Sequence, residues 1–358
     1  MKPTQELHDL GQSLWLDNIT RTMLDDGTEQ GYIDRYNVTG QTSNPTIFDK
    51  AISGGDAYDE QIAELREKGM EPEEIFFELA LADVTRAAKL FAEIHKQTDR
   101  MDGWVSLEVS PKLAYDTQAT TQQAADLHGR AEQNNFIKIP GTPEGLPAIE
   151  ESIFAGVPIN VTLLMSSDQT MAAAEAYMKG IERRIAADLD PDVPSVLSLF
   201  ISRWDVAVHD QVPDEMKNTL GVAVGKETYA AWRAMLDSDR WKGLADKGAR
   251  LQRLLFASTG TKDENASDTL YIEAFAAPDT INTMPDKTLE AFADHGKVGD
   301  PLPADGGDFE ETYKAHRDQG VDVDGLGLQL QKEGAEKFVE SWNELLETIK
   351  SESERLVA

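Results

Sequence analysis

Short runs of apolar and β-branched residues alternate with longer amphipathic segments along the chain. The runs that we interpret as strands are Ser13–Asn18, Tyr36–Asn44, Trp104–Val109, Phe136–Pro140, Pro158–Leu164, Ser195–Ser202, Leu254–Ser258 and Thr269–Phe275. Between them, apolar residues recur three and four positions apart, which predicts helices with one buried face at Pro72–His95, Thr117–Gln133, Asp168–Asp188 and Glu227–Leu236. Strand and helix repeated about eight times predict an α/β fold in which parallel β-α-β units close into a (β/α)8 (TIM) barrel. An open doubly wound sheet is the main alternative.

Two stretches depart from this repeat, and we expect one domain over residues 1–358 that carries both as additions. Residues 54–71 are polar and charged, which predicts an insertion. Residues 298–325 are rich in Pro, Gly and Asp, which predicts an acidic surface excursion before a last helix near Gln329–Lys350. Apolar residues at helical spacing predict that this extra C-terminal helix packs on the barrel rather than binding a partner: Phe338, Trp342, Leu345 and Leu346.

The chain is strongly acidic, with 34 Lys and Arg against 65 Asp and Glu and a formal net charge of −31. A field of this sign repels nucleic-acid backbones and anionic membranes, so we expect neither as a partner. The first residues lack the apolar stretch of a secretory signal, and we expect a cytoplasmic protein that is a monomer or a homodimer. Two interpretations of the acidity stay open: a solvated surface that aids solubility, which we favour, and a cell interior of high ionic strength.

Composition and motifs argue against metal and cofactor chemistry. The chain has no Cys, which excludes disulfides, thiolate metal sites and Cys nucleophiles, and its 6 His are scattered. The run from Gly221 to Glu227 is one residue short of a phosphate-loop spacing, and residues 320–331 lack the carboxylates that begin and end a calcium loop. No GxGxxG motif follows a strand. We therefore expect no metal site and no cofactor.

The strand around Lys138 places a basic side chain on its inner face. Because side chains alternate along a barrel strand, Ile137 and Ile139 would pack under the helices while Phe136 and Lys138 point into the barrel. Burial disfavours the charged form of an amine, and the neutral form is a nucleophile for carbonyl carbons. On this strand alone, a salt-bridged Lys at a strand end is the simpler interpretation.

The other strands favour a functional lysine. Polar residues lie on the predicted inner face or at the end of most of them: Asp17, Thr42, Asn44, Ser106, Glu108, Asn160, Thr162, Ser198 and Ser202. Together they predict a solvent-excluded reaction chamber at the C-terminal mouth of a barrel. One amine with two carboxyl groups, amides and hydroxyls suits a Schiff base on a polyhydroxylated carbonyl compound, with no metal needed.

At these residues the chain resembles the transaldolase family, whose fold is an (α/β)8 barrel. Thr42-Ser-Asn-Pro-Thr-Ile-Phe is similar to one family signature, although Gln41 is less usual before it. Phe136-Ile-Lys-Ile-Pro-Gly-Thr-Pro-Glu-Gly-Leu resembles the signature around the Schiff-base lysine. The resemblance runs from about Ser13 to Pro285. It implies a transferase of the non-oxidative pentose phosphate pathway. Such an enzyme moves a dihydroxyacetone unit from sedoheptulose 7-phosphate or fructose 6-phosphate to glyceraldehyde 3-phosphate or erythrose 4-phosphate.

The resemblance also implies catalytic roles for four residues. Lys138 forms the imine with the donor ketose phosphate, and Asp17 takes the proton from its C4 hydroxyl as the carbon–carbon bond breaks. Glu108 and Thr162 position a water that carries protons during imine formation and release. A protonated imine draws electrons from the breaking bond, and fixed dipoles stabilise the resulting carbanion.

Substrate binding is implied for a second group of residues. Asn44 and Asn160 would hydrogen-bond the substrate hydroxyls or the carbanion, while Ser198 and Arg203 would hold the phosphate. Arg suits a phosphate because its fork is planar and always charged. The family often has a second phosphate-binding Arg after the seventh strand. This chain has Ala257-Ser-Thr-Gly-Thr-Lys there, so we expect Lys262 or the backbone of residues 258–259 to serve instead.

Three alternatives remain beside this interpretation. The nearest is an aldolase of the fructose-6-phosphate type, which tends to carry Gln at the position of Glu108 and Tyr at that of Phe200. The Glu and the Phe of this chain favour transfer, and we count Phe200 among the substrate-binding residues. A catalytically silent barrel that binds sugar phosphates or a protein would be expected to lack Lys138, Asp17 or Glu108, and none is missing. A module fused to an isomerase has no room in 358 residues.

Overall fold

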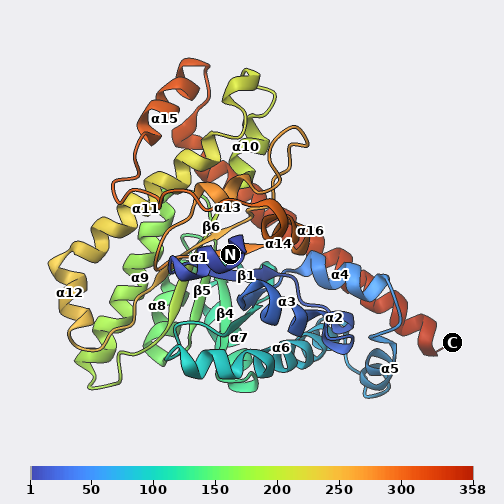
Figure 1. Ribbon diagram of the computed structural model, residues 1–358. Helices are drawn as coiled ribbons and strands as arrows, with labels where there is room; N and C mark the ends of the chain where they lie inside the picture. The colour runs from blue at the N-terminus through green and yellow to red at the C-terminus, as the bar shows by residue number, and fades with distance from the viewer. Residues whose placement is uncertain (1, 358) are drawn as a thin grey trace.

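A closed barrel of parallel strands forms the centre of the computed structural model, which describes residues 2–357 (Figure 1). Within that range the strands pair in chain order, and the last pairs with the first, so the predicted (β/α)8 barrel is confirmed and the open sheet is excluded. The strands are β1 Ser13–Asp17, β2 Val38–Thr42, β3 Trp104–Glu108, β4 Asn135–Pro140, β5 Ile159–Leu164, β6 Ser195–Phe200, β7 Arg253–Ala257 and β8 Ile281–Met284.

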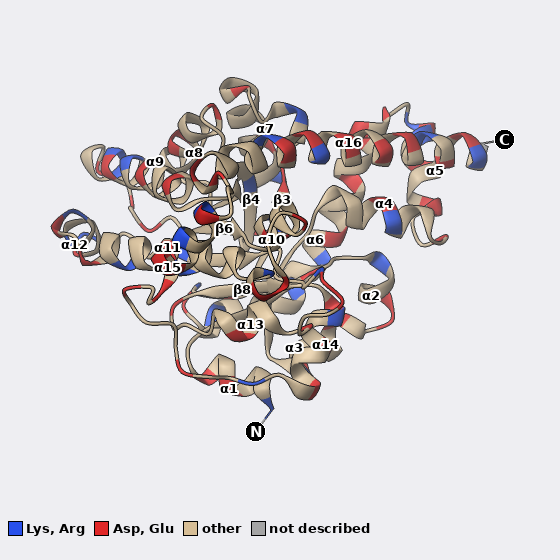
Figure 2. Cartoon of the chain, turned by 90° about the horizontal axis from the view of Figure 1, so that it is seen from above, with Lys and Arg blue, Asp and Glu red and all other residues tan. Residues whose placement is uncertain are grey.

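Helices connect consecutive strands and cover the outside of the barrel (Figures 1 and 2). The predicted amphipathic segments form α6, α7, α9 and part of α11. The α-helices are α1 Pro3–Asp9, α2 Arg21–Asp25, α3 Thr28–Tyr36, α4 Pro45–Ser53, α5 Asp59–Glu67, α6 Pro72–Gln97, α7 Thr117–Arg130, α8 Gly145–Ala155, α9 Ser167–Ala186, α10 Ser202–Val208, α11 Leu220–Asp237, α12 Asp239–Ala245, α13 Leu270–Ala274, α14 Asp286–His295, α15 Phe309–Asp318 and α16 Val323–Val357. Two short 3₁₀ turns are η1 Pro111–Leu113 and η2 Asp214–Met216.

The eighth strand corrects the sequence interpretation. The segment Thr269–Phe275, which we expected to be a strand, contains the helix α13, and β8 lies further on at Ile281–Met284. The phenol of Tyr271 donates a hydrogen bond of 2.6 Å to the buried carboxylate of Asp205, which ties α13 to α10. The aromatic and branched residues of this segment are therefore buried as part of a helix. The barrel is closed instead by a short strand that contains two polar residues.

Aromatic rings fill the barrel interior below its mouth. Trp104 and Phe136 stack with ring centroids 4.1 Å apart, and Trp15 lies 6.3 Å from Phe136. A Cβ atom at Gly40 would come within 2.5 Å of the Trp15 ring, so a glycine is required there. Because side chains alternate along a strand, the residue two positions after each ring points to the same interior at a higher level. The residues at this higher level are polar: Asp17, Ser106 and Lys138.

The long helix α16 passes the C-terminal ends of the strands and continues beside α4 and α5 (Figures 1 and 2). Trp342 anchors it, because this ring is 1% exposed and packs on Phe76 and Phe77 of α6 at 4.7 and 5.7 Å. The expected C-terminal helix near Gln329–Lys350 is thus present, with longer bounds, and it packs on the barrel as predicted.

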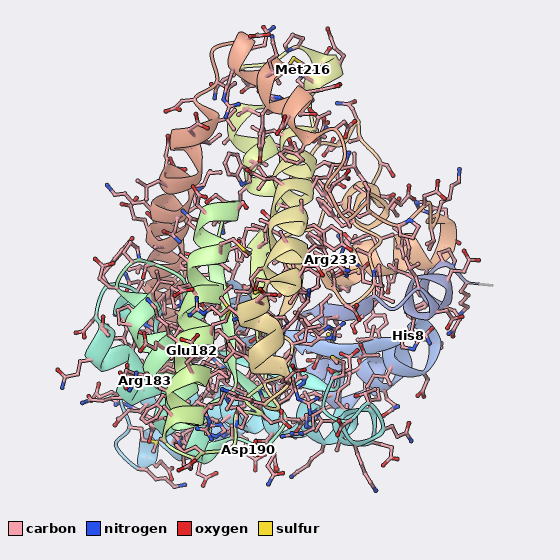
Figure 3. All side chains as sticks on the ribbon, turned by 90° about the vertical axis from the view of Figure 1, so that its left-hand side faces the viewer. His8, Glu182, Arg183, Asp190, Met216 and Arg233 are labelled. Carbon is pink, nitrogen blue, oxygen red and sulfur yellow. The ribbon has the colours of Figure 1, made fainter. Side chains whose placement is uncertain are left out.

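The two predicted additions contain helices. Residues 54–71 include α5, and residues 298–325 include α15 and the start of α16. Asp190, before β6, and Met216, beyond α10, lie at opposite ends of the molecule in Figure 3, which separates the two barrel ends. Among the described residues, no helix is long and apolar enough to cross a membrane.

Candidate active site

A pocket of about 650 Å³ opens at the C-terminal ends of the strands. Most of the residues predicted for the site line it: Asp17, Asn44, Lys138, Thr162, Ser198, Phe200, Arg203 and Lys262. The other two, Glu108 and Asn160, are buried directly beside it and contact residues of the pocket wall. The fold therefore brings the ten predicted residues into one place, since each parallel strand ends at the same mouth.

Lys138 is buried at the centre of this arrangement, with 5% of its surface exposed. Strand pairing sets Glu108 and Asn160 directly on either side of it, in β3 and β5. The Nζ atom lies 3.2 Å from Glu108 Oε2 and donates a hydrogen bond of 3.0 Å to the carbonyl oxygen of Ser43. The amine is thus held in place while one side of it still faces the pocket.

Asp17, at the end of β1, is a second carboxyl group of the pocket. Thr42 donates a hydrogen bond of 2.7 Å to its Oδ1 atom, and the hydroxyls of Thr42 and Thr283 lie 2.8 Å apart. Since the Thr42 proton points to Asp17, Thr283 is the donor of the second bond. Burial raises the pKa of Asp17, and this shift is opposed by Lys138, by the Thr42 hydrogen bond and by Lys262.

Glu108 and Thr162 carry polar atoms with no partner for hydrogen bonding among the described residues. They are the Oε1 atom of Glu108 and the hydroxyl of Thr162, and both are buried, whereas Glu108 Oε2 is the oxygen that pairs with Lys138. Burial raises the pKa of the Glu108 carboxyl; the Lys138 charge opposes this shift, and Asp17 adds to it. Unpaired buried polar groups are costly, so their presence beside a lysine marks a functional site rather than a core.

An amide and two hydroxyls form a chain along the wall opposite Asp17. Ser198 donates a hydrogen bond of 2.6 Å to Asn160 Oδ1, and Asn160 Nδ2 donates one of 3.1 Å to the Ser106 hydroxyl. Asn44 is also the N-cap of α4, because its side-chain oxygen accepts a hydrogen bond from Ile47 N. These contacts fix the rotamers of the side chains that face the pocket.

The cationic part of the pocket comes from Arg203, at the start of α10, and Lys262, after β7. Neither makes a hydrogen bond or an ion pair to another described residue. Burial lowers the pKa of Arg203, while the nearby charge of Glu333 raises it. Two cations without an ion-pair partner among the described residues suit an anionic ligand.

Sequence reasoning missed several residues of the pocket. Thr283 was missed because β8 was assigned to the wrong segment. Thr42 had been noted as a polar strand end, but nothing in the pattern showed its bond to Asp17. Ser258 was expected to act only through its backbone, which is left-handed (φ 54°), and the position of its hydroxyl, 2.8 Å from that of Ser202, was not foreseen. Phe338 was expected only to pack on the barrel, yet it lines the pocket.

The motifs that were rejected for cofactors do not form sites. Residues 221–227 lie inside the helix α11 rather than in a phosphate-binding loop. Residues 320–331 lie mostly in the first turns of α16. In the part of the chain that the structure describes, no three His, Cys, Asp or Glu side chains are placed to hold a metal ion.

Comparison with known proteins adds a family to this geometry. Residues 14–349 match the sequence model of a family described as transaldolase/fructose-6-phosphate aldolase. The relatives include a transaldolase of Saccharopolyspora erythraea, 39% identical over 97% of both chains. Another, from Renibacterium salmoninarum, is 41% identical over 97% of this chain and 95% of its own. A protein named transaldolase 2, from Streptomyces coelicolor, is 39% identical over 98% of this chain and 97% of its own.

Proposed function

The chain belongs to the transaldolase/fructose-6-phosphate aldolase family, and we propose that within it this protein is a transaldolase. It transfers a dihydroxyacetone unit from a ketose phosphate, fructose 6-phosphate or sedoheptulose 7-phosphate, to an aldose phosphate. The observation that supports this best is the buried Lys138 amine, 3.2 Å from Glu108 in a pocket that also holds Asp17. One amine between two acidic groups provides a nucleophile and two proton carriers.

The reaction begins at Lys138. Its nitrogen adds to the C2 carbonyl of the ketose, the oxygen leaves as water, and a protonated imine remains. Asp17 then accepts the proton of the C4 hydroxyl, the C3–C4 bond breaks, and its electron pair moves into the imine to give an enamine. The aldose leaves, an acceptor aldehyde takes its place, and the same steps run in reverse until water releases Lys138.

The surrounding groups support these steps. Glu108 Oε1 and the Thr162 hydroxyl, which have no partner among the described residues, are suited to hold the water that enters and leaves at the imine carbon. Asn160, already fixed by Ser198 and Ser106, presents a rigid amide to the substrate hydroxyls or the carbanion. Asn44 lines the pocket, which suits the same role.

The phosphate of the substrate binds to the cationic part of the pocket. Arg203 supplies a guanidinium with no hydrogen-bond partner among the described residues, and Ser198 and Phe200 line the same pocket as Arg203 and Lys138. Lys262 takes the place of the second family Arg, supported by its position in the pocket wall and by the absence of an ion pair with any other residue that the structure describes.

Borohydride trapping tests the lysine assignment. Reduction in the presence of fructose 6-phosphate should fix a dihydroxyacetone-derived mass on the peptide that contains Lys138, because borohydride reduces the imine to a stable amine. The variant Lys138→Ala should lose the label, with Lys226→Ala as a matched control that keeps it, since Lys226 pairs with Asp308 outside the pocket. Labelling that persists in Lys138→Ala would show that another residue forms the imine.

A coupled assay separates transfer from simple cleavage. With erythrose 4-phosphate present, a transaldolase consumes fructose 6-phosphate, and without an acceptor it releases little free dihydroxyacetone. Equal rates with and without the acceptor would favour an aldolase, and no turnover with a stable fold would favour a silent barrel. Glu108 and Phe200 support the first outcome.

A further inference from the structure

Two phenyl rings lie next to the Arg203 guanidinium and next to each other. Its Cζ atom lies 5.4 Å from the ring centroid of Phe200 and 5.7 Å from that of Phe338. The two rings are 6.4 Å apart and inclined by 62°. We call Phe200, Arg203 and Phe338 the aromatic cluster. It joins the end of β6 to the C-terminal helix α16, two segments far apart in the sequence.

The contacts of Arg203, which is partly buried, differ from those of two other arginines, the buried Arg253 and the partly buried Arg21. Arg253, at the opposite end of β7, donates to backbone carbonyls and to Ser13, and Arg21 pairs with the Asp83 carboxylate at 2.9 Å. Arg203 makes no hydrogen bond or ion pair to any described residue, and it touches aromatic faces instead. A ring attracts a guanidinium without using its N–H donors, so the whole planar fork stays free for a phosphate.

Phe338 is fixed by the helix that carries it. One turn later, Trp342 is buried against α6, and two turns earlier the Gln331 amide donates hydrogen bonds of 3.0 Å to the carbonyls of Gly141 and Leu163. One turn before Phe338 stands Gly334, where a Cβ atom would lie 3.3 Å from Arg203 Nη1. The helix therefore leaves room for the guanidinium and presents a ring to it.

We propose that Phe338 is a positioning residue for phosphate recognition: it holds the Arg203 guanidinium at the pocket wall in the orientation that meets the substrate phosphate. This proposal rests on the proposed transaldolase function. It gives α16 a part in substrate selection, because the ring orients a group that contacts only the phosphate and not the reacting carbons. The ring itself touches neither the imine nor the bond that breaks.

The test is a comparison of acceptors in the variant Phe338→Leu, which keeps an apolar side chain but removes the π face. With saturating fructose 6-phosphate, KM for glyceraldehyde 3-phosphate should rise about 3- to 30-fold, the range expected for losing a partly desolvated cation–π contact. KM for unphosphorylated glyceraldehyde should stay within about twofold, and kcat should change little. Phe338→Trp should keep the low KM for glyceraldehyde 3-phosphate, because tryptophan also presents a π face to Arg203.

Two controls keep the outcome interpretable. Phe309→Leu removes a half-buried ring on α15 that packs on Tyr313 away from the pocket, and it should leave both KM values unchanged. Borohydride trapping of Lys138 with free dihydroxyacetone should persist in Phe338→Leu, as measured by mass spectrometry.

If the wild-type protein does not form the trapped adduct, the proposed function is wrong. If trapping holds but KM is unchanged, or rises equally for both acceptors, the positioning proposal is wrong. Should Phe338→Leu not fold, Phe338→Met is compared with Phe338→Trp in the same assay.

Discussion

Asp17 and Glu108 share one mouth with one buried amine, and their protonation states depend on each other. Burial raises the pKa of both carboxyl groups, and the charge of Lys138 opposes both shifts. Asp17 must be ionised to accept the C4 proton. Activity should therefore be lost as the pH falls through the raised pKa of Asp17, so the acidic limb of the pH profile lies above that of an exposed Asp.

The hydrogen bond from Thr42 gives a direct test of this limb. It stabilises the ionised form of Asp17, so it lowers the pKa of that carboxyl. The variant Thr42→Val removes the donor, raises the pKa further, and should move the acidic limb of kcat/KM to higher pH. The measurement is the pH profile of the coupled assay with fructose 6-phosphate and erythrose 4-phosphate.

A second threonine on the same strand provides the control. Thr39 is also in β2 and is buried, but its hydroxyl makes no hydrogen bond to another described residue. Thr39→Val should leave the acidic limb in place. A limb that moves equally in both variants, or in neither, would show that the Thr42 bond does not set the ionisation of Asp17.

At the scale of elements, local patterns predicted seven of the strands near their observed positions. The pattern worked because most of these strands are apolar runs interrupted by polar residues on the inner face, although β2 is largely polar. The eighth failed for a physical reason. Thr269–Phe275 is more apolar than β8, whose residues include Asn282 and Thr283, and closure of the barrel overrides local preference.

The part of the site contributed by α16 could not be predicted from the sequence. The spacing of Phe338 and Trp342 predicts a buried helical face, and it does not show which partner that face meets. In the structure, Trp342 packs on α6 while Phe338 turns to Arg203. Contacts between distant segments are set by the tertiary arrangement. Two residues of one apolar pattern therefore differ in role: Trp342 anchors the helix, and Phe338 lines the pocket.

Gln331 is the second contact of α16 that only the fold reveals. Leu163 has a left-handed backbone (φ 57°) at an irregularity of β5, which frees its carbonyl from regular pairing, and Gln331 donates to that oxygen. Gln331→Leu leaves the buried carbonyls of Gly141 and Leu163 without this donor, so the free energy of unfolding should fall by about 1–3 kcal/mol. Urea denaturation followed by fluorescence measures the change.

An exposed glutamine half a turn away serves as the comparison. Gln329 is exposed and bonds only to Glu333 on its own helix. Gln329→Leu should change the free energy of unfolding by less than about 0.5 kcal/mol. If the free energy of unfolding falls equally in Gln331→Leu and Gln329→Leu, the loss comes from placing leucine in this part of α16. It would then not come from the missing hydrogen bonds to the two carbonyls.

At the scale of the whole molecule, a net charge of −31 opposes the approach of sugar phosphates. Acidic residues occur on helices all around the barrel (Figure 2), and many of the basic ones are paired with them. Arg183 on α9, labelled in Figure 3, bonds to Glu150 and Glu151, for example. The cations at the mouth are different, since Arg203 and Lys262 carry no carboxylate partner among the described residues.

Lys50 is a third cation near the mouth, and it lies further out than Arg203 and Lys262. It is an exposed residue of α4 that makes no ion pair with another described residue, and it lines an outer pocket of about 1170 Å³ that shares Arg203 and Lys262 with the inner one. A cation at this place should draw dianionic substrates toward the mouth against the overall field. The effect should depend on ionic strength, because charges are screened beyond about 8 Å at physiological salt.

Lys50→Gln should therefore lower kcat/KM for fructose 6-phosphate about 2- to 10-fold at low salt, with kcat unchanged, and the loss should shrink as KCl is added. Lys247→Gln changes the net charge equally, but Lys247 lies before β7 at the other end of the barrel, so kcat/KM should stay near that of the wild type. Steady-state kinetics across a KCl series distinguish the two sites. An equal loss in both variants would assign the effect to net charge alone, whereas a loss confined to Lys50→Gln that fades with salt places the attraction at the mouth.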